Sequence, residues 1–114
     1  NVNSAGLTAA EAALGDVEHL DWVVARNAEQ RGVLAAALRA RGLTVFPSQT
    51  NFLLTQFAEP GDNARVAKIE AALCEVGVVL RPMVGYGLGH CLRITVGNAD
   101  ENRRLLAALD EVLA

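Results

Sequence analysis

The chain has 114 residues, enough for one domain that buries a sizeable core, so it needs no disulfide framework. Its formal charge of −3 and the absence of a Lys/Arg run argue against nucleic-acid and acidic-membrane partners. No apolar stretch approaches the ~20 residues of a membrane span, and no signal-peptide pattern opens the chain. Cys74 and Cys91 fall within a predicted helix and a predicted strand. We therefore expect both to be unpaired, small buried residues in a reducing compartment. We expect a cytoplasmic protein.

The first 42 residues predict two helices. Residues 5–15 carry apolar side chains at helical spacing, and Gly15 suits a left-handed helix end. Residues 19–42 are rich in good helix formers and stop at Gly42. A helix of this length spans about 30 Å, more than so small a core requires. Because the chain also begins at Asn1 and not at Met, we expect residues 1–42 to link to a missing domain of a longer protein.

The rest of the chain alternates strands and helices. Strands are predicted at 43–46, 51–57, 78–82 and 92–96 from their β-branched and aromatic content. One helix begins at Asp62 or Asn63 and ends at Gly77; the last follows a capping box of Asn98 and Glu101. Strands this short and apolar need covering helices. We therefore predict an α+β fold, a small and mostly antiparallel sheet with helices on one face, and a domain spanning residues 43–114.

Two arginines stand out in the strands. Side chains alternate between the faces of a strand, so Arg93 points away from the face that Leu92, Ile94 and Val96 share. Arg81 closes an apolar run, and Pro82 directly after it cannot donate to a ladder, which places Arg81 at a strand end. Two guanidinium groups beside one loop predict a site for a carboxylate or phosphate.

Other candidates carry weaker signals. Residues 85–89 form a glycine-rich, mobile loop that permits close approach of a ligand, and it contains Tyr86, the single tyrosine. Neither histidine has a partner at metal-ligand spacing, and no nucleophilic triad is evident. Lys68, the single lysine, lies among solvated groups and lacks the desolvated or cationic setting of a Schiff-base lysine.

The residues alone leave alternatives open. Either arginine is also consistent with a surface position or an internal ion pair. A free-standing module that binds a small anion, and an α+β association domain with both arginines in solvent, fit the same pattern.

Four motifs carry a resemblance to a known family: NVNS at 1–4, FPSQTNFLL at 46–54, GVVLRPMVGYGL at 77–88 and CLRITVGNADEN at 91–102. In this order and spacing, the chain resembles the C-terminal part of the histidinol-phosphate aminotransferase family, fold-type I enzymes that use pyridoxal phosphate. The resemblance covers nearly the whole chain. It implies that the long helix connects a large cofactor domain to the small C-terminal domain, and that the enzyme is a homodimer.

The resemblance also implies roles for residues. The arginine of the LRIT motif, Arg93, would bind the carboxylate of glutamate or 2-oxoglutarate and the phosphate of histidinol phosphate, with help from Arg81 and with Tyr86 as a further contact. Relatives act on aromatic amino acids or decarboxylate threonine phosphate. The family's cofactor lysine and its partners have no counterpart here, so the chain alone is expected to bind no pyridoxal phosphate covalently and to transaminate nothing. Gly89 replaces a common proline, which should loosen the loop.

Overall fold

The computed structural model describes residues 2–114 and contains four α-helices, four strands and one short 3₁₀ helix. The helices are α1 (Ser4–Gly15), α2 (Val17–Ala40), α3 (Asn63–Glu75) and α4 (Ala99–Val112). The strands are β1 (Thr44–Val45), β2 (Phe52–Gln56), β3 (Arg81–Pro82) and β4 (Cys91–Thr95), and the 3₁₀ helix η1 spans Val84–Tyr86. The order of helices and strands agrees with the sequence-based prediction.

The four strands form one antiparallel sheet in the order β1-β2-β4-β3. Leu53 pairs with Ile94 and Thr55 with Leu92, so these four side chains share one face of the sheet. All four are buried. The opposite face carries the alternate residues of the two central strands, including Arg93.

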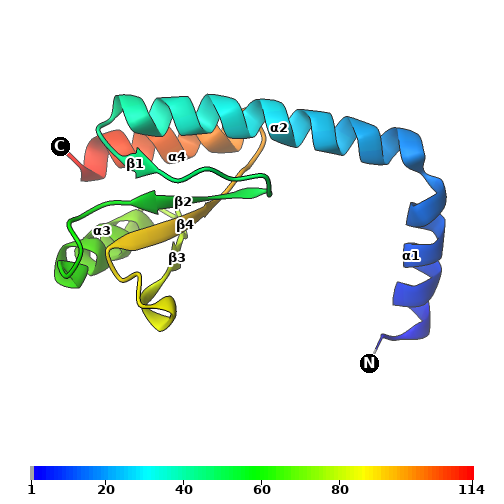
Figure 1. The fold of residues 1–114 in the computed structure, drawn as a ribbon, viewed down its shortest axis with the longest axis horizontal. Helices are drawn as coiled ribbons and strands as arrows, with labels where there is room; N and C mark the ends of the chain where they lie inside the picture. The colour runs from blue at the N-terminus through cyan, green and yellow to red at the C-terminus, as the bar shows by residue number, and fades with distance from the viewer. Residues whose placement is uncertain (1) are drawn as a thin grey trace.

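Helices α2, α3 and α4 cover the face that carries Leu53 and Ile94. Figure 1 shows α4 running alongside α2 above the sheet. The three helices and the sheet bury one continuous apolar cluster, whose fully buried helical members are Leu34, Leu38, Leu73 and Leu109. The predicted α+β class, with a small antiparallel sheet covered by helices, is therefore confirmed.

The predicted strand at 78–82 is mostly wrong, because only Arg81 and Pro82 pair with β4. Residues 77 and 78 instead close the C-terminal end of α3. Gly77 adopts φ +77°, and the backbone N–H of Val78 donates to the carbonyl of Leu73 at 2.9 Å. This closing bond turns the chain, and Val79 is left 80% exposed. The apolar, β-branched composition of residues 78–80 does not reveal that the N–H of Val78 bonds to the end of α3 and not to a neighbouring strand.

The break between α1 and α2 was predicted at the right place but with the wrong geometry. Gly15 is the last residue of α1 and is not left-handed; Asp16 is the cap instead. The Asp16 side chain accepts the N–H of His19, so α2 begins at Val17, two residues before the predicted start. At the other end α2 stops at Ala40, and Gly42 takes φ +79°.

Residues 4–26, named here the N-terminal arm, project from the rest of the molecule (Figure 1). None of them is buried, and the buried residues of α2 begin at Gln30. The radius of gyration is 16.5 Å, against about 13 Å for a compact domain of this length. The arm therefore contributes nothing to the core. Its exposed apolar side chains are Leu7, Leu14, Val17, Leu20, Trp22, Val23 and Val24.

Candidate functional site

Arg81 and Arg93 are direct cross-strand partners in the β3–β4 ladder. Residues opposite one another in an antiparallel pair project from the same face, with Cβ atoms about 4.5–5.5 Å apart. This face is the one that the helices leave uncovered. Pro82 lies on the edge strand β3, where its missing N–H removes no interior ladder bond. The structure thus brings together the two arginines that the sequence singled out.

Arg93 is held by packing. Its Cζ atom lies 4.7 Å from the centroid of the Phe52 ring, a cation–π contact between β4 and β2. Its Nε atom is buried and has no hydrogen-bond partner among the described residues. Arg81, by contrast, is exposed.

Neither arginine is neutralised by a carboxylate within residues 2–114. The ion pairs in that range join Arg26 to Glu29, Arg41 to Asp110 and Arg103 to Asp100. An internal ion pair, one of the alternatives left open by the sequence, is therefore not what the structure places at Arg81 or Arg93. Two like charges that face each other across a ladder destabilise it, and an external anion would relieve this repulsion.

The glycine-rich loop contains a short helical turn that the sequence analysis did not predict. Residues Val84–Tyr86 form η1, closed by hydrogen bonds from the N–H of Tyr86 to the Met83 carbonyl and from Gly87 to Val84, each 3.0 Å long. Gly87 has φ +72°, which allows the chain to turn back toward β4. Tyr86 is 66% exposed. The side chain is open to solvent at the tip of the connection between the two arginine-bearing strands.

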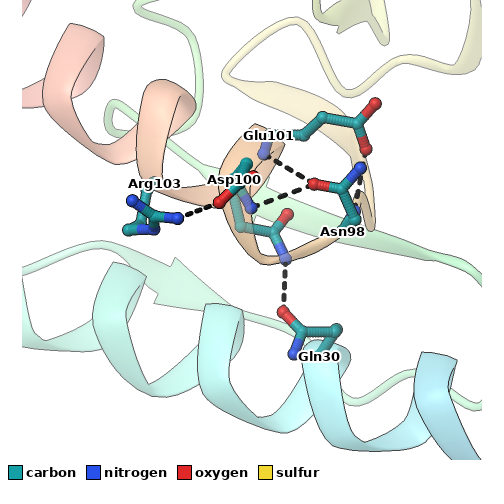
Figure 2. Close-up of polar contacts among 6 residues, drawn as sticks. Gln30, Asn98, Asp100, Glu101 and Arg103 are labelled. Carbon is teal, nitrogen blue, oxygen red and sulfur yellow. Dashed lines mark hydrogen bonds and ion pairs between the residues drawn. The ribbon is translucent and has the colours of Figure 1, made fainter.

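The end of β4 is fixed by a polar cluster that the sequence only partly predicted. The expected capping box is confirmed: the Asn98 side chain accepts the N–H groups of Asp100 and Glu101, and Glu101 accepts the N–H of Asn98 (Figure 2). The buried Asn102 was missed. Its side-chain oxygen accepts the N–H of Gly97, and its side-chain nitrogen donates to the Gly97 carbonyl, at 3.0 Å each.

Asn102 also joins two helices. Its amide donates to Oε1 of the buried Gln30 on α2 at 3.1 Å, across 72 residues of sequence; Figure 2 shows Gln30 pointing from its helix toward the turn. This bond ties the start of α4, and so the exit of β4, to α2. The sequence signal that could have identified Asn102 is its position one residue after the capping-box glutamate, on the inward side of α4.

A groove of ≈ 810 Å³ lies elsewhere, between α2 and the two segments 49–51 and 96–98. Asn27 and Arg31 cross it and both donate to the carbonyl of Thr50, at 3.3 and 3.0 Å. None of the three predicted site residues lines this groove. The arginine pair therefore lies on an open sheet face rather than in an enclosed cavity of this chain.

Lys68, the single lysine of the sequence, is exposed on α3. An amine that forms a Schiff base is usually desolvated or crowded by cations, whereas the side chain of Lys68 is open to solvent. Among residues 2–114 no cluster of three His, Cys, Asp or Glu side chains is placed to hold a metal ion. In the same range no helix is long and apolar enough to cross a membrane.

Comparison with known proteins supplies the family. The family model for aminotransferase class I and II matches residues 1–109. The chain therefore belongs to the class I and II aminotransferases. Within that family it is 44% identical over 113 residues to the histidinol-phosphate aminotransferase of Anaeromyxobacter sp. (strain Fw109-5), and 45% identical over 114 residues to histidinol-phosphate aminotransferase 1 of Thiobacillus denitrificans. These matches confirm the resemblance that the four motifs indicate.

The match is to part of each relative. The alignments cover 99% and 100% of this chain but 30% and 28% of the two relatives. A crystal structure of histidinol-phosphate aminotransferase from Sinorhizobium meliloti, in complex with pyridoxal-5'-phosphate, matches with a TM-score of 0.80 and 32% identity. It aligns over 95% of this chain and 29% of that chain. A decarboxylase from Sulfurospirillum multivorans shares the fold, with a TM-score of 0.82 at 22% identity.

Proposed function

We propose that this chain is the small-domain portion of a pyridoxal-phosphate-dependent histidinol-phosphate aminotransferase, and that Arg93 and Arg81 bind the anionic group of its substrates. The longer enzyme would transfer the amino group between L-histidinol phosphate and 2-oxoglutarate. Family membership and the similar relatives support the reaction class. The observation that carries the proposal is the Arg81–Arg93 pair, two cations opposite one another with no carboxylate between them.

The chain's own contribution is recognition. A guanidinium offers a planar fork that matches two oxygens of a carboxylate or phosphate, and each charge-assisted hydrogen bond contributes about 1.5–3 kcal/mol. Two guanidinium groups side by side suit a phosphate dianion, and one guanidinium suffices for a carboxylate. Pyridoxal phosphate, bound by residues outside this chain, would supply the electron sink. Tyr86, exposed between the two strands, would close over the bound anion.

We also propose that residues 1–42 link this portion to the cofactor domain of the longer enzyme. The N-terminal arm supports this, because its apolar side chains are exposed and the chain spans about 30% of the length of its relatives. Surfaces of this kind are normally covered. Sedimentation of this chain and of the longer enzyme tests the assignment: we expect self-association of the chain through the arm, and a homodimer of the longer enzyme. A monomeric chain with a freely exposed arm would contradict it.

The proposed substrate role is tested in the longer enzyme by Arg93→Gln and Arg81→Gln. We expect a higher KM for histidinol phosphate in both, and a higher KM for 2-oxoglutarate chiefly in Arg93→Gln. The control is Arg65→Gln, which removes an exposed arginine of α3 that lies outside every ion pair described above. Unchanged KM values in Arg93→Gln would overturn the assignment.

A decarboxylase acting on a phosphorylated amino acid is the second candidate, because the Sulfurospirillum decarboxylase has the same fold. The same anion-binding pair would serve it. Release of carbon dioxide from threonine phosphate by the longer enzyme, without amino transfer to 2-oxoglutarate, would favour this reaction. If neither reaction occurs but the 114-residue chain binds phosphate, a free-standing anion-binding module is the correct description.

A further inference from the structure

We propose that Phe52 is a positioning residue, which holds the Arg93 guanidinium in place for the incoming anion. This inference rests on the proposed function and adds a residue that the motifs did not single out. Phe52 begins β2 and pairs with Thr95, while Arg93 pairs with Leu54. Phe52 is therefore a diagonal neighbour of Arg93 on the same face, within reach of an aromatic ring. The 4.7 Å separation between Arg93 Cζ and the ring centroid realises that contact.

The kind of contact matters because the usual means of fixing an arginine would defeat its purpose. A carboxylate beside Arg93 would hold the side chain but would occupy the same N–H groups that the substrate needs. An aromatic face attracts the cation through its quadrupole and leaves the terminal N–H groups unused. Within residues 2–114 no carboxylate pairs with Arg93, and its buried Nε has no partner. Phe52 thus restrains the cation without neutralising it.

Phe52 also shapes what Arg93 can bind. The ring occupies one side of the guanidinium, with Arg93 Cζ 4.7 Å from the ring centroid, so an anion must approach the terminal N–H groups from another side. An edge-on fork matches an oxyanion with two oxygens in its plane, as in a carboxylate or a phosphate. The terminal N–H groups of Arg93 therefore stay available to a carboxylate or phosphate, the ligand class of the proposed function.

The test measures binding of inorganic phosphate to the full 114-residue chain by calorimetry at fixed low ionic strength. The variants are Phe52→Leu, Phe52→Tyr, Arg93→Gln and, as a matched control, Phe46→Leu. Phe46 is a half-exposed phenylalanine beside β1 that makes no cation–π contact with Arg93. We expect Phe52→Leu to bind phosphate roughly threefold to tenfold more weakly. Phe52→Tyr, which keeps the ring, and Phe46→Leu should bind as the unaltered chain does.

A spectroscopic readout separates positioning from general stability. The Nε–Hε NMR signal of Arg93, assigned by its loss in Arg93→Gln, should carry a ring-current shift that disappears in Phe52→Leu and remains in Phe52→Tyr. Urea midpoints identify any variant that merely unfolds. If Arg93→Gln loses phosphate binding while Phe52→Leu keeps it, Phe52 has no positioning role and the proposed function stands. If Arg93→Gln binds phosphate normally, both proposals are wrong.

Discussion

Arg41 and Asp110 form a two-pronged ion pair that closes the end of α2 against the end of α4. Arg41 Nε lies 2.6 Å from Asp110 Oδ1, and Arg41 Nη2 lies 2.7 Å from Asp110 Oδ2. The hydrogen bonds from Arg41 lower the pKa of Asp110 below its usual range, and they raise the pKa of Arg41 in return. The pair joins residues 69 positions apart, at the opposite end of α2 from the arm.

The lowered pKa of Asp110 makes this stabilisation dependent on pH. A carboxylate with a lower pKa in the folded state stabilises above its unfolded pKa, about 3.9, and loses this effect as the pH falls through the folded value. We expect Asp110→Asn to have a lower urea midpoint than the unaltered chain at pH 7. The difference should shrink as the pH falls through the lowered pKa of Asp110, and it should also shrink in high salt. Glu59→Gln, an exposed carboxylate outside the described ion pairs, is the control.

Asn102→Ala should destabilise the chain by about 2 kcal/mol or more, because it leaves buried polar groups without partners. The orphaned groups would be the N–H and carbonyl of Gly97 and the amide of Gln30. Urea unfolding measures the loss, and Glu111→Gln on the exposed side of α4 serves as the control. A double-mutant cycle with Gln30→Ala should give a non-zero coupling energy. Additive effects would mean that the bond between the two helices contributes nothing.

Gly89→Ala should destabilise the chain by about 1–2 kcal/mol, through overpacking. A Cβ atom at Gly89, which is buried, would lie 2.5 Å from Cγ of Asn63. The double variant Gly89→Ala with Asn63→Ala removes the obstructing atoms and should recover most of the loss. Thermal unfolding of the two single variants and the double variant checks this. Equal losses in Gly89→Ala and the double variant would locate the strain elsewhere.

Arg81→Gln should raise the unfolding midpoint of the chain at low ionic strength in the absence of anions, because it removes a like charge opposite Arg93. The gain should fade in 1 M salt. The same variant should lose most of the stabilisation that phosphate gives the unaltered chain. Arg65→Gln is expected to change neither quantity. A lower midpoint for Arg81→Gln without phosphate would show that the two cations do not repel each other.

Periodicity predicted what depends on neighbours within one element. The alternation in residues 92–96 correctly placed Arg93 opposite the buried face, and the spacing of Asn98 and Glu101 identified the capping box. Chain order also indicated that the strands of Arg81 and Arg93 would be adjacent. These features follow from local geometry and from short connections, which a sequence displays directly.

The remaining features depend on contacts that no local pattern encodes. Phe52 meets Arg93 only because β2 and β4 pair in one register, and a shift of one residue would put the ring on the other face. Asn102 and Gln30 meet only because α4 packs against α2. Gly89 is buried against Asn63, the first residue of α3. In each case the missing information was the identity of a distant neighbour.

The N-terminal arm affects the solubility of the chain but not its folding, although in so small a chain the same residues usually determine both. Since no residue of the arm is buried, removing the arm would leave the buried apolar cluster intact while eliminating many of the exposed apolar side chains. We therefore expect removal of the arm to raise the solubility of the chain without unfolding it. A shortened version beginning before Asn27, which keeps the bond from Asn27 to Thr50, would be the natural starting material for crystallising the arginine pair with an anion.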